Sequence, residues 1–132
     1  MNPKHIQIGA LGEGAVRNHL KRKGFVPIES NFRAKTGEID LILKKNQKVH
    51  FIEVKTVSCE TASLRTQPVS HGTYRPEDNV HRGKLRKLLN TIQVWLSVHK
   101  YEGDWQLDIA AVYLDIEAKK ASVRMTENVI VE

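Results

Sequence analysis

Several features that define other classes of protein are missing from this sequence. It has one cysteine among 132 residues, which excludes an internal disulfide and a four-thiolate zinc site. It has no long apolar run, and its first residues lack the apolar segment and cleavage site of a signal peptide. It also has no internal repeat or low-complexity tract. These absences favour a cytoplasmic, globular protein without a membrane segment, and the length predicts a single domain over residues 1–132.

The charge balance favours a polyanionic partner. Lysine and arginine number 21 against 15 aspartates and glutamates, which gives a net charge of +6. Contacts with phosphates and the release of counterions reward such a balance in nucleic-acid-binding proteins. A basic surface that serves only solubility explains the same charge, so composition alone does not decide between the two.

Hydrophobic periodicity predicts two helices and five strands in the order α-β-β-β-α-β-β. The predicted elements are a helix at 8–25, an edge strand at 25–33 that contains Pro27, two strands within 37–55, a helix at 77–100, and strands at 105–116 and 120–130. Residues 58–82 have little periodicity and are predicted to form a long loop, which in a compact domain is usually functional or disordered. This order predicts an α/β fold, a central mixed sheet with a helix on either side.

The stretch "GEIDLILKKNQKVHFIEVK", residues 37–55, reads as a hairpin that turns at Asn46 and Gln47. In a symmetric antiparallel hairpin, opposed residue numbers have a constant sum, here 93. The predicted pairs are Ile42 with Phe51, Asp40 with Glu53, and Glu38 with Lys55. Because side chains alternate along a strand, these six residues are predicted to share one face of the sheet. The other face is predicted to hold Ile39, Leu41, Leu43, His50, Ile52 and Val54.

The pairing of Asp40 with Glu53 predicts a metal site. Directly opposed residues have Cβ atoms about 4.5–5.5 Å apart, where two carboxylates repel each other. A divalent cation such as Mg²⁺ or Mn²⁺ would convert this repulsion into a set of ligands, because hard cations bind carboxylate oxygens. Lys55 follows Glu53 on the same face. Its ammonium would act on a metal-bound water or stabilise charge on a phosphate.

The same spacing occurs a second time in the sequence, at Asp104, Glu117 and Lys119. Here the aspartate and the glutamate are predicted to lie at opposite ends of one strand, about 40 Å apart at about 3.3 Å per residue. They are therefore not expected to converge. The spacing alone is therefore a weak indication of a site. The first copy predicts a site because the hairpin brings its aspartate and glutamate together.

"GEIDLI" followed by "FIEVK" resembles the core of the PD-(D/E)XK nuclease superfamily, which has the restriction-endonuclease-like fold. The sequence is most similar to the YraN-like family of predicted endonucleases and more distantly to archaeal Holliday-junction resolvases. The resemblance extends over nearly the whole chain and includes "GEGAVRNHLKRKGF" and "KLRKLLNTIQVWL". Two positions depart from the family: Val16 replaces a small residue, and Gln106-Leu107 replaces the usual arginine-phenylalanine pair.

The resemblance implies roles for individual residues of the hairpin and the first helix. Asp40 and Glu53 would be metal ligands, Lys55 the catalytic lysine, and Glu13 a third acidic ligand. On a helical wheel Glu13 borders the apolar face, which suits an inward-pointing carboxylate, although an exposed residue at a helix boundary is the alternative. Glu38, opposite Lys55, either positions that lysine or takes part in catalysis.

The remaining candidates are polar residues around this site. Asp108, between apolar neighbours in a strand, is predicted to be a buried, hydrogen-bonded group that supports the second helix. The candidates for nucleic-acid contacts are Asn31, Arg33, Arg82, Lys84, Arg86 and Lys87, together with Arg65 and Arg75 of the loop. Solvated strand and helix surfaces explain these basic residues as well.

The leading hypothesis is a Mg²⁺- or Mn²⁺-dependent endonuclease that cuts DNA. Backbone contacts position a nucleic acid without reading its bases, so selectivity for DNA structure is expected rather than for sequence. One small domain offers little surface for choosing a substrate, which favours a partner or a homodimer. The alternatives are a non-catalytic nucleic-acid-binding module that retains a nuclease fold, and a structural adaptor. The adaptor leaves the repulsion between Asp40 and Glu53 unexplained.

Overall fold

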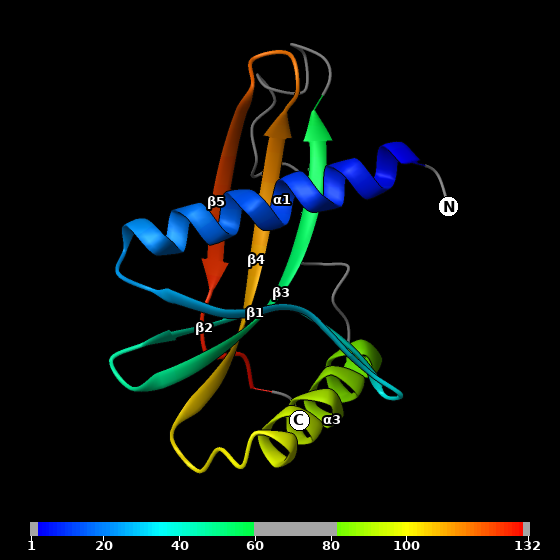
Figure 1. Cartoon of the computed structure of the whole chain (residues 1–132). Helices are drawn as coiled ribbons and strands as arrows, with labels where there is room; N and C mark the ends of the chain where they lie inside the picture. The colour runs from blue at the N-terminus through cyan, green and yellow to red at the C-terminus, as the bar shows by residue number, and fades with distance from the viewer. Residues whose placement is uncertain (1–2, 60–81, 131–132) are drawn as a thin grey trace.

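The computed structural model describes residues 3–59 and 82–130, and its elements follow the predicted order (Figure 1). They are α1 (Pro3–Arg22), β1 (Val26–Ala34), β2 (Gly37–Lys45), β3 (Lys48–Cys59), α3 (Arg82–Val98), β4 (Trp105–Asp115) and β5 (Lys120–Thr126). β3 continues through Cys59 and α3 begins at Arg82, so both ends of the predicted loop at 58–82 belong to regular elements. The remaining positions of that prediction, 60–81, lie outside the described residues.

The five strands form one mixed sheet in the order β1-β2-β3-β4-β5. β3 and β4 run parallel, and the other neighbouring pairs are antiparallel. β1 is an edge strand, as its proline predicts, and its pairing with β2 has a bulge between Pro27 and Glu29. A parallel neighbour requires a crossover, and α3 lies in the crossover between β3 and β4.

The two helices cover opposite faces of the sheet, which confirms the predicted α/β architecture. α1 crosses β3, β4 and β5, whereas α3 lies near the opposite end of the molecule against β2 and β1 (Figure 1). Two apolar clusters result. The cluster under α1 contains Val16, Leu20, Leu41, Leu43, Ile52, Ala110, Val112 and Leu114. The cluster under α3 contains Ile39, Ile42, Val49, Phe51, Leu88, Ile92, Trp95 and Leu107. Within the described part of the chain, no helix is both long and apolar enough to cross a bilayer.

The hairpin turn has the geometry that sets the predicted register. Asn46 and Gln47 both have positive φ, 52° and 66°, as in the tight two-residue turns that match the twist of paired strands. Ile42 pairs with Phe51 and Leu41 with Ile52, as predicted. The pairing between β2 and β3 ends there, so the predicted pairs of Asp40 with Glu53 and of Glu38 with Lys55 do not form.

The reason is that β2 leaves β3 at this point and continues beside β1. Glu38 pairs with Arg33 of β1, and their side chains form an ion pair of 3.7 Å. The prediction that Ile39 and Ile42 lie on opposite faces of the sheet is also wrong. Both residues pack under α3. These two residues are three positions apart, so strict alternation does not hold where β2 separates from β3.

Asp108 is buried and hydrogen-bonded, but it does not support α3 as predicted. Its carboxylate lies 2.9 Å from Nδ1 of His50 and accepts hydrogen bonds from Nε2 of Gln106 at 2.7 Å and from the backbone N–H of Asn128 at 2.8 Å. Its neighbour Leu107 packs under α3, so alternation turns Asp108 toward the other face of the sheet. Asp108 therefore ties β3, β4 and the segment after β5 together.

Gly12 allows α1 to approach β3 unusually closely. A Cβ atom at Gly12 would collide with the hydroxyl of Thr56, whereas one at Gly14 would meet no atom within 4 Å. We expect Gly12→Ala to lower the free energy of unfolding by about 1–3 kcal/mol through overpacking. Gly14→Ala should raise it by up to about 1 kcal/mol, because alanine favours the helix. Urea unfolding of both variants measures this difference, and equal effects would contradict the close contact.

Candidate active site

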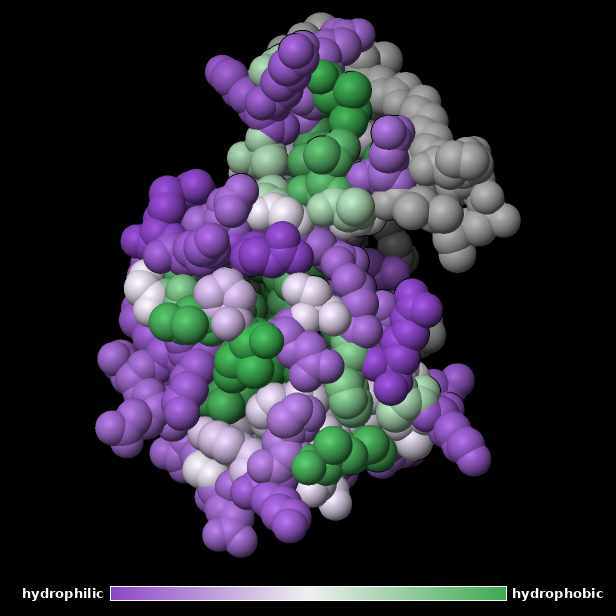
Figure 2. All heavy atoms as spheres, in the orientation of Figure 1, coloured by the Kyte–Doolittle hydropathy of each residue, from purple (hydrophilic) through white to green (hydrophobic). Residues whose placement is uncertain are grey.

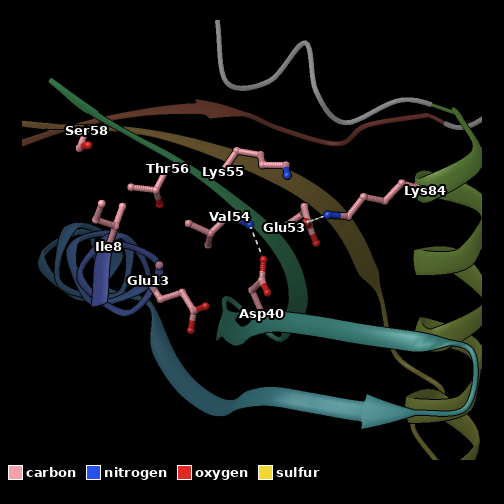
Figure 3. A pocket seen from close by; sticks show the side chains of 10 residues that line it. Ile8, Glu13, Asp40, Glu53, Val54, Lys55, Thr56, Ser58 and Lys84 are labelled. Atoms are coloured by element: carbon pink, nitrogen blue, oxygen red, sulfur yellow. Dashed lines mark hydrogen bonds and ion pairs between the residues drawn. The ribbon is translucent and has the colours of Figure 1, made fainter. Parts of the chain in front are cut away.

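A pocket of about 450 Å³ opens where β2 separates from β3, and it brings the predicted catalytic residues together (Figure 3). Glu13 comes from α1, Asp40 from β2, Glu53 and Lys55 from β3, and Lys84 from the first turn of α3. In Figure 3 the Asp40 carboxylate lies between those of Glu13 and Glu53. The pocket thus collects three acids and two lysines from four elements.

Asp40 is fixed by the backbone of the neighbouring strand. The N–H of Val54 donates a hydrogen bond to its Oδ2 at 2.8 Å, in place of the backbone pairing that ends at Leu41. Burial and the nearby charge of Glu53 raise the pKa of Asp40 to about 7, against the opposing effect of that hydrogen bond. The predicted repulsion between Asp40 and Glu53 is therefore present although the two residues are not a paired position of the sheet.

Glu53 is the most deeply buried acid of the pocket, and a lysine neutralises it. Its side chain is 5% exposed, and Nζ of Lys84 lies 2.8 Å from its Oε1. A buried carboxylate requires such a partner, because its ionised form loses the hydration of water. Burial alone would lower the pKa of Lys84, but the hydrogen bond and charge of Glu53 outweigh it and raise that pKa. The sequence predicted a phosphate contact for Lys84 and gave no indication of this ion pair.

Lys55 lies in the same pocket without the predicted partner Glu38. Burial lowers the pKa of Lys55, and the nearby ammonium of Lys84 lowers it further. A lysine with a lowered pKa gives up its proton more readily at neutral pH, so Lys55 is suited to proton transfer as well as to charge stabilisation.

Glu13 and Glu38 are joined by Asn31 at the side of the pocket. With its amide nitrogen turned toward the two acids, Asn31 donates to Oε1 of Glu38 at 2.9 Å and to Oε1 of Glu13 at 3.2 Å. Burial raises the pKa of Glu13, the Asn31 hydrogen bond opposes this, and the charge of Glu38 adds to it. Asn31 has a φ of 54°, a left-handed conformation that asparagine tolerates well. Asn31 thus orients acids of the site, a role that the sequence did not indicate.

The three carboxylates of the pocket are of a type that suits a hard divalent cation, although they are not close enough together to form a ready-made metal site. Within the described ranges, no three histidine, cysteine, aspartate or glutamate side chains are grouped as a ready-made metal site. Glu13, Asp40 and Glu53 nevertheless offer carboxylate oxygens in one pocket, the ligand type that Mg²⁺ and Mn²⁺ prefer. Among the residues that the structure describes, Val54 and Lys84 engage one oxygen each of Asp40 and Glu53, and the second oxygen of each is available for a cation.

The other predicted nucleic-acid contacts lie outside this pocket or outside the described atoms. Arg33 is exposed on the edge strand, and Arg86 and Lys87 are exposed on α3. Arg82 begins α3, but its side chain is not among those described, and Arg65 and Arg75 lie in 60–81.

α3 has no acidic residue in its first turn and no basic residue in its last, the reverse of what the helix dipole favours. An anionic ligand near its N-terminus would compensate for this arrangement.

The second copy of the spacing does not form a site, as predicted. Asp104 precedes β4 and Glu117 follows it, so the two acids lie beyond opposite ends of an 11-residue strand.

A second pocket of about 430 Å³ lies between α1 and the β4–β5 turn, with apolar lining residues such as Leu11, Leu114 and Ile116. Figure 2 shows hydrophobic side chains in this upper part of the molecule. The catalytic residue types gather in the first pocket.

Comparison with known proteins places the chain in a family. The model of "Uncharacterised protein family UPF0102" matches residues 12–112, a range that includes all five charged residues of the pocket. The chain belongs to the UPF0102 family. A UPF0102 protein of Campylobacter lari is 33% identical over 121 residues, 92% of this chain and 91% of the relative. A UPF0102 protein of Vibrio campbellii is 33% identical over 110 residues, 81% of each chain. This membership confirms the YraN-like part of the resemblance, and the family's name states no activity.

Proposed function

We propose that this UPF0102 protein is a metal-dependent endonuclease that hydrolyses phosphodiester bonds in DNA. The observation that carries the proposal is the pocket itself, where Asp40, Glu53 and Lys55 converge although no sheet pairing joins the two acids. Two buried acids that repel each other destabilise a fold. Cation binding is the function that best accounts for their presence, because carboxylate oxygens are ligands for hard cations. The resemblance to PD-(D/E)XK nucleases assigns the same three residues to catalysis.

The residues of the pocket divide the work between them. Asp40, Glu53 and Glu13 would hold Mg²⁺ or Mn²⁺, which supplies an activated water and neutralises charge on the phosphate. Lys55 orients the attacking water and accepts its proton, or stabilises the charge that develops on the phosphate. Lys84, which lines the pocket from the first turn of α3, would contact the DNA backbone, a contact that positions a substrate by shape and leaves the bases unread.

We further propose that the protein acts in the cytoplasm on branched or single-stranded DNA, alone or as a homodimer that adds substrate-binding surface. A non-catalytic nucleic-acid-binding module is the second candidate. One observation favours it: the three acids are not gathered into a ready-made cation site within the described residues. Both candidates predict DNA binding, and only the nuclease predicts cleavage that a chelator abolishes.

Calorimetric titration with Mn²⁺ tests the cation site directly. We expect the wild-type protein to bind the cation and Glu53→Gln to lose that binding, because an amide carries no charge to offset dehydration of the ion. Glu117→Gln is the matched control, since it makes the same change in the second copy of the spacing and should bind as the wild type does. Each titration is repeated with DNA present, because a phosphate completes many such sites. Equal binding by wild type and Glu53→Gln would contradict the assignment.

A further inference from the structure

The two acids of the pocket have partners of different kinds. The partner of Asp40 is the backbone N–H of Val54, which is fixed in β3 and cannot leave. The partner of Glu53 is the side chain of Lys84, which is 43% exposed and reaches across from α3. A lysine side chain has a flexible four-carbon stem and a strongly hydrated ammonium group. Lys84 can therefore move into water, whereas Glu53, at 5% exposure, cannot remain buried and charged without another cation.

The surroundings of Lys84 favour a second position for its ammonium group. Lys55 lines the same pocket, and the repulsion between these two lysines contributes to the lowered pKa of Lys55. The first turn of α3 carries no acid that would hold Lys84 on its own helix. Among the acids that line the pocket, Glu53 is the one to which Lys84 is bonded. An incoming phosphate would offer Lys84 a new partner at the pocket mouth.

We propose that Lys84 is an exchangeable counter-ion of Glu53: it neutralises the carboxylate until a divalent cation binds there, and its released ammonium then binds a substrate phosphate. This inference rests on the proposed function and adds a mechanism for coupling its two ligands. A bound cation frees Lys84 for DNA, and DNA holds Lys84 away from Glu53. Because linkage is reciprocal, cation and DNA must raise each other's affinity by the same factor.

Lys84→Met tests the exchange, because methionine keeps much of the side-chain length and removes the charge. Without DNA, calorimetry should show Mn²⁺ binding to this variant about tenfold more tightly than to the wild type, since the competing ion pair is gone. Lys87→Met is the matched control. It removes the same charge from an exposed position one turn further along α3, and should change Mn²⁺ affinity less than about twofold. Circular dichroism melts confirm that both variants are folded.

The second measurement is DNA affinity by fluorescence anisotropy, with and without Ca²⁺, which also binds carboxylate oxygens. The cation should raise the DNA affinity of the wild type and of Lys87→Met clearly more than that of Lys84→Met. Unchanged or weaker Mn²⁺ binding by Lys84→Met, or an equal gain in Lys87→Met, would overturn the exchange and leave the proposed cation site intact. The absence of cation binding in all three proteins would overturn both.

Discussion

Asp40→Asn is expected to reduce DNA cleavage by about a thousandfold or more. The asparagine has the same shape, and its side-chain oxygen can still accept the hydrogen bond from Val54. What the substitution removes is the negative charge that would hold the divalent cation and, through it, the scissile phosphate. Metal ions contribute several kcal/mol to transition-state stabilisation, and each 1.4 kcal/mol corresponds to about a tenfold change in rate. Initial rates on fluorescent branched, single-stranded and duplex DNA at saturating Mg²⁺ measure the loss.

Asp104→Asn is the control for that experiment. It makes the same chemical change at an exposed position that belongs to the second copy of the spacing. Asp104 lies before β4, away from the pocket, so its variant should cut DNA at the wild-type rate. Cleavage by Asp40→Asn at a rate near that of the wild type would refute the metal-ligand role of Asp40. Cleavage by the wild type that survives chelation would refute the dependence on a cation.

The same Asp40→Asn substitution is expected to stabilise the cation-free protein at pH 8. In the folded protein the pKa of Asp40 is about 7, compared with a usual value of 3.8, so folding favours its protonated form. The stability that the protonated Asp40 side chain contributes is fully present below about pH 4 and is lost as pH rises through 7. A pKa difference of this size corresponds to at most about 4 kcal/mol. An asparagine resembles the protonated acid and avoids this loss.

Thermal melts at pH 4 and pH 8 test this expectation. With a chelator present, Asp40→Asn should melt about 5–10 °C above the wild type at pH 8, whereas the difference should be small at pH 4. Saturating Mg²⁺ at pH 8 should stabilise the wild type and not the variant, because a ligand stabilises only the state that binds it. A variant that melts below the wild type at pH 8 would mean that Asp40 is not destabilised by its surroundings. Stability and cation binding thus place opposite demands on this residue.

The parts of the site that were predictable depend on short-range rules. The turn at Asn46 and Gln47 fixes the pairing of the next few residues, so Ile42 and Phe51 fall where the numbering places them. The grouping of Asp40, Glu53 and Lys55 follows from that register even though the strands separate before they reach it. The period of the apolar residues likewise predicted both helices, and the order of the elements predicted a helix on either side of the sheet.

The parts that were not predictable depend on how distant segments pack. β2 continues beside β1 after it separates from β3, and a hairpin considered alone gives no indication of that separation. The contact between Lys84 and Glu53 depends on where α3 lies after the crossover, and no spacing rule joins residues 31 positions apart. The side-chain amide of Asn31 donates hydrogen bonds to Glu13 and Glu38, and β1 brings Asn31 to the site only when the whole sheet is folded. In each case the missing information was tertiary.

The two-residue turn of the hairpin also limits how this family can vary in length. Surface turns usually tolerate insertions, and Asn46 and Gln47 are exposed. Here one added residue would slip β2 against β3 and move Asp40 by one position relative to Glu53, which turns its side chain away from the pocket. The effect would reach an acid roughly 20 Å along the strand from the insertion. We infer that the number of residues between the two acids is fixed, and that the turn residues can change only to residues that tolerate positive φ, such as glycine or aspartate.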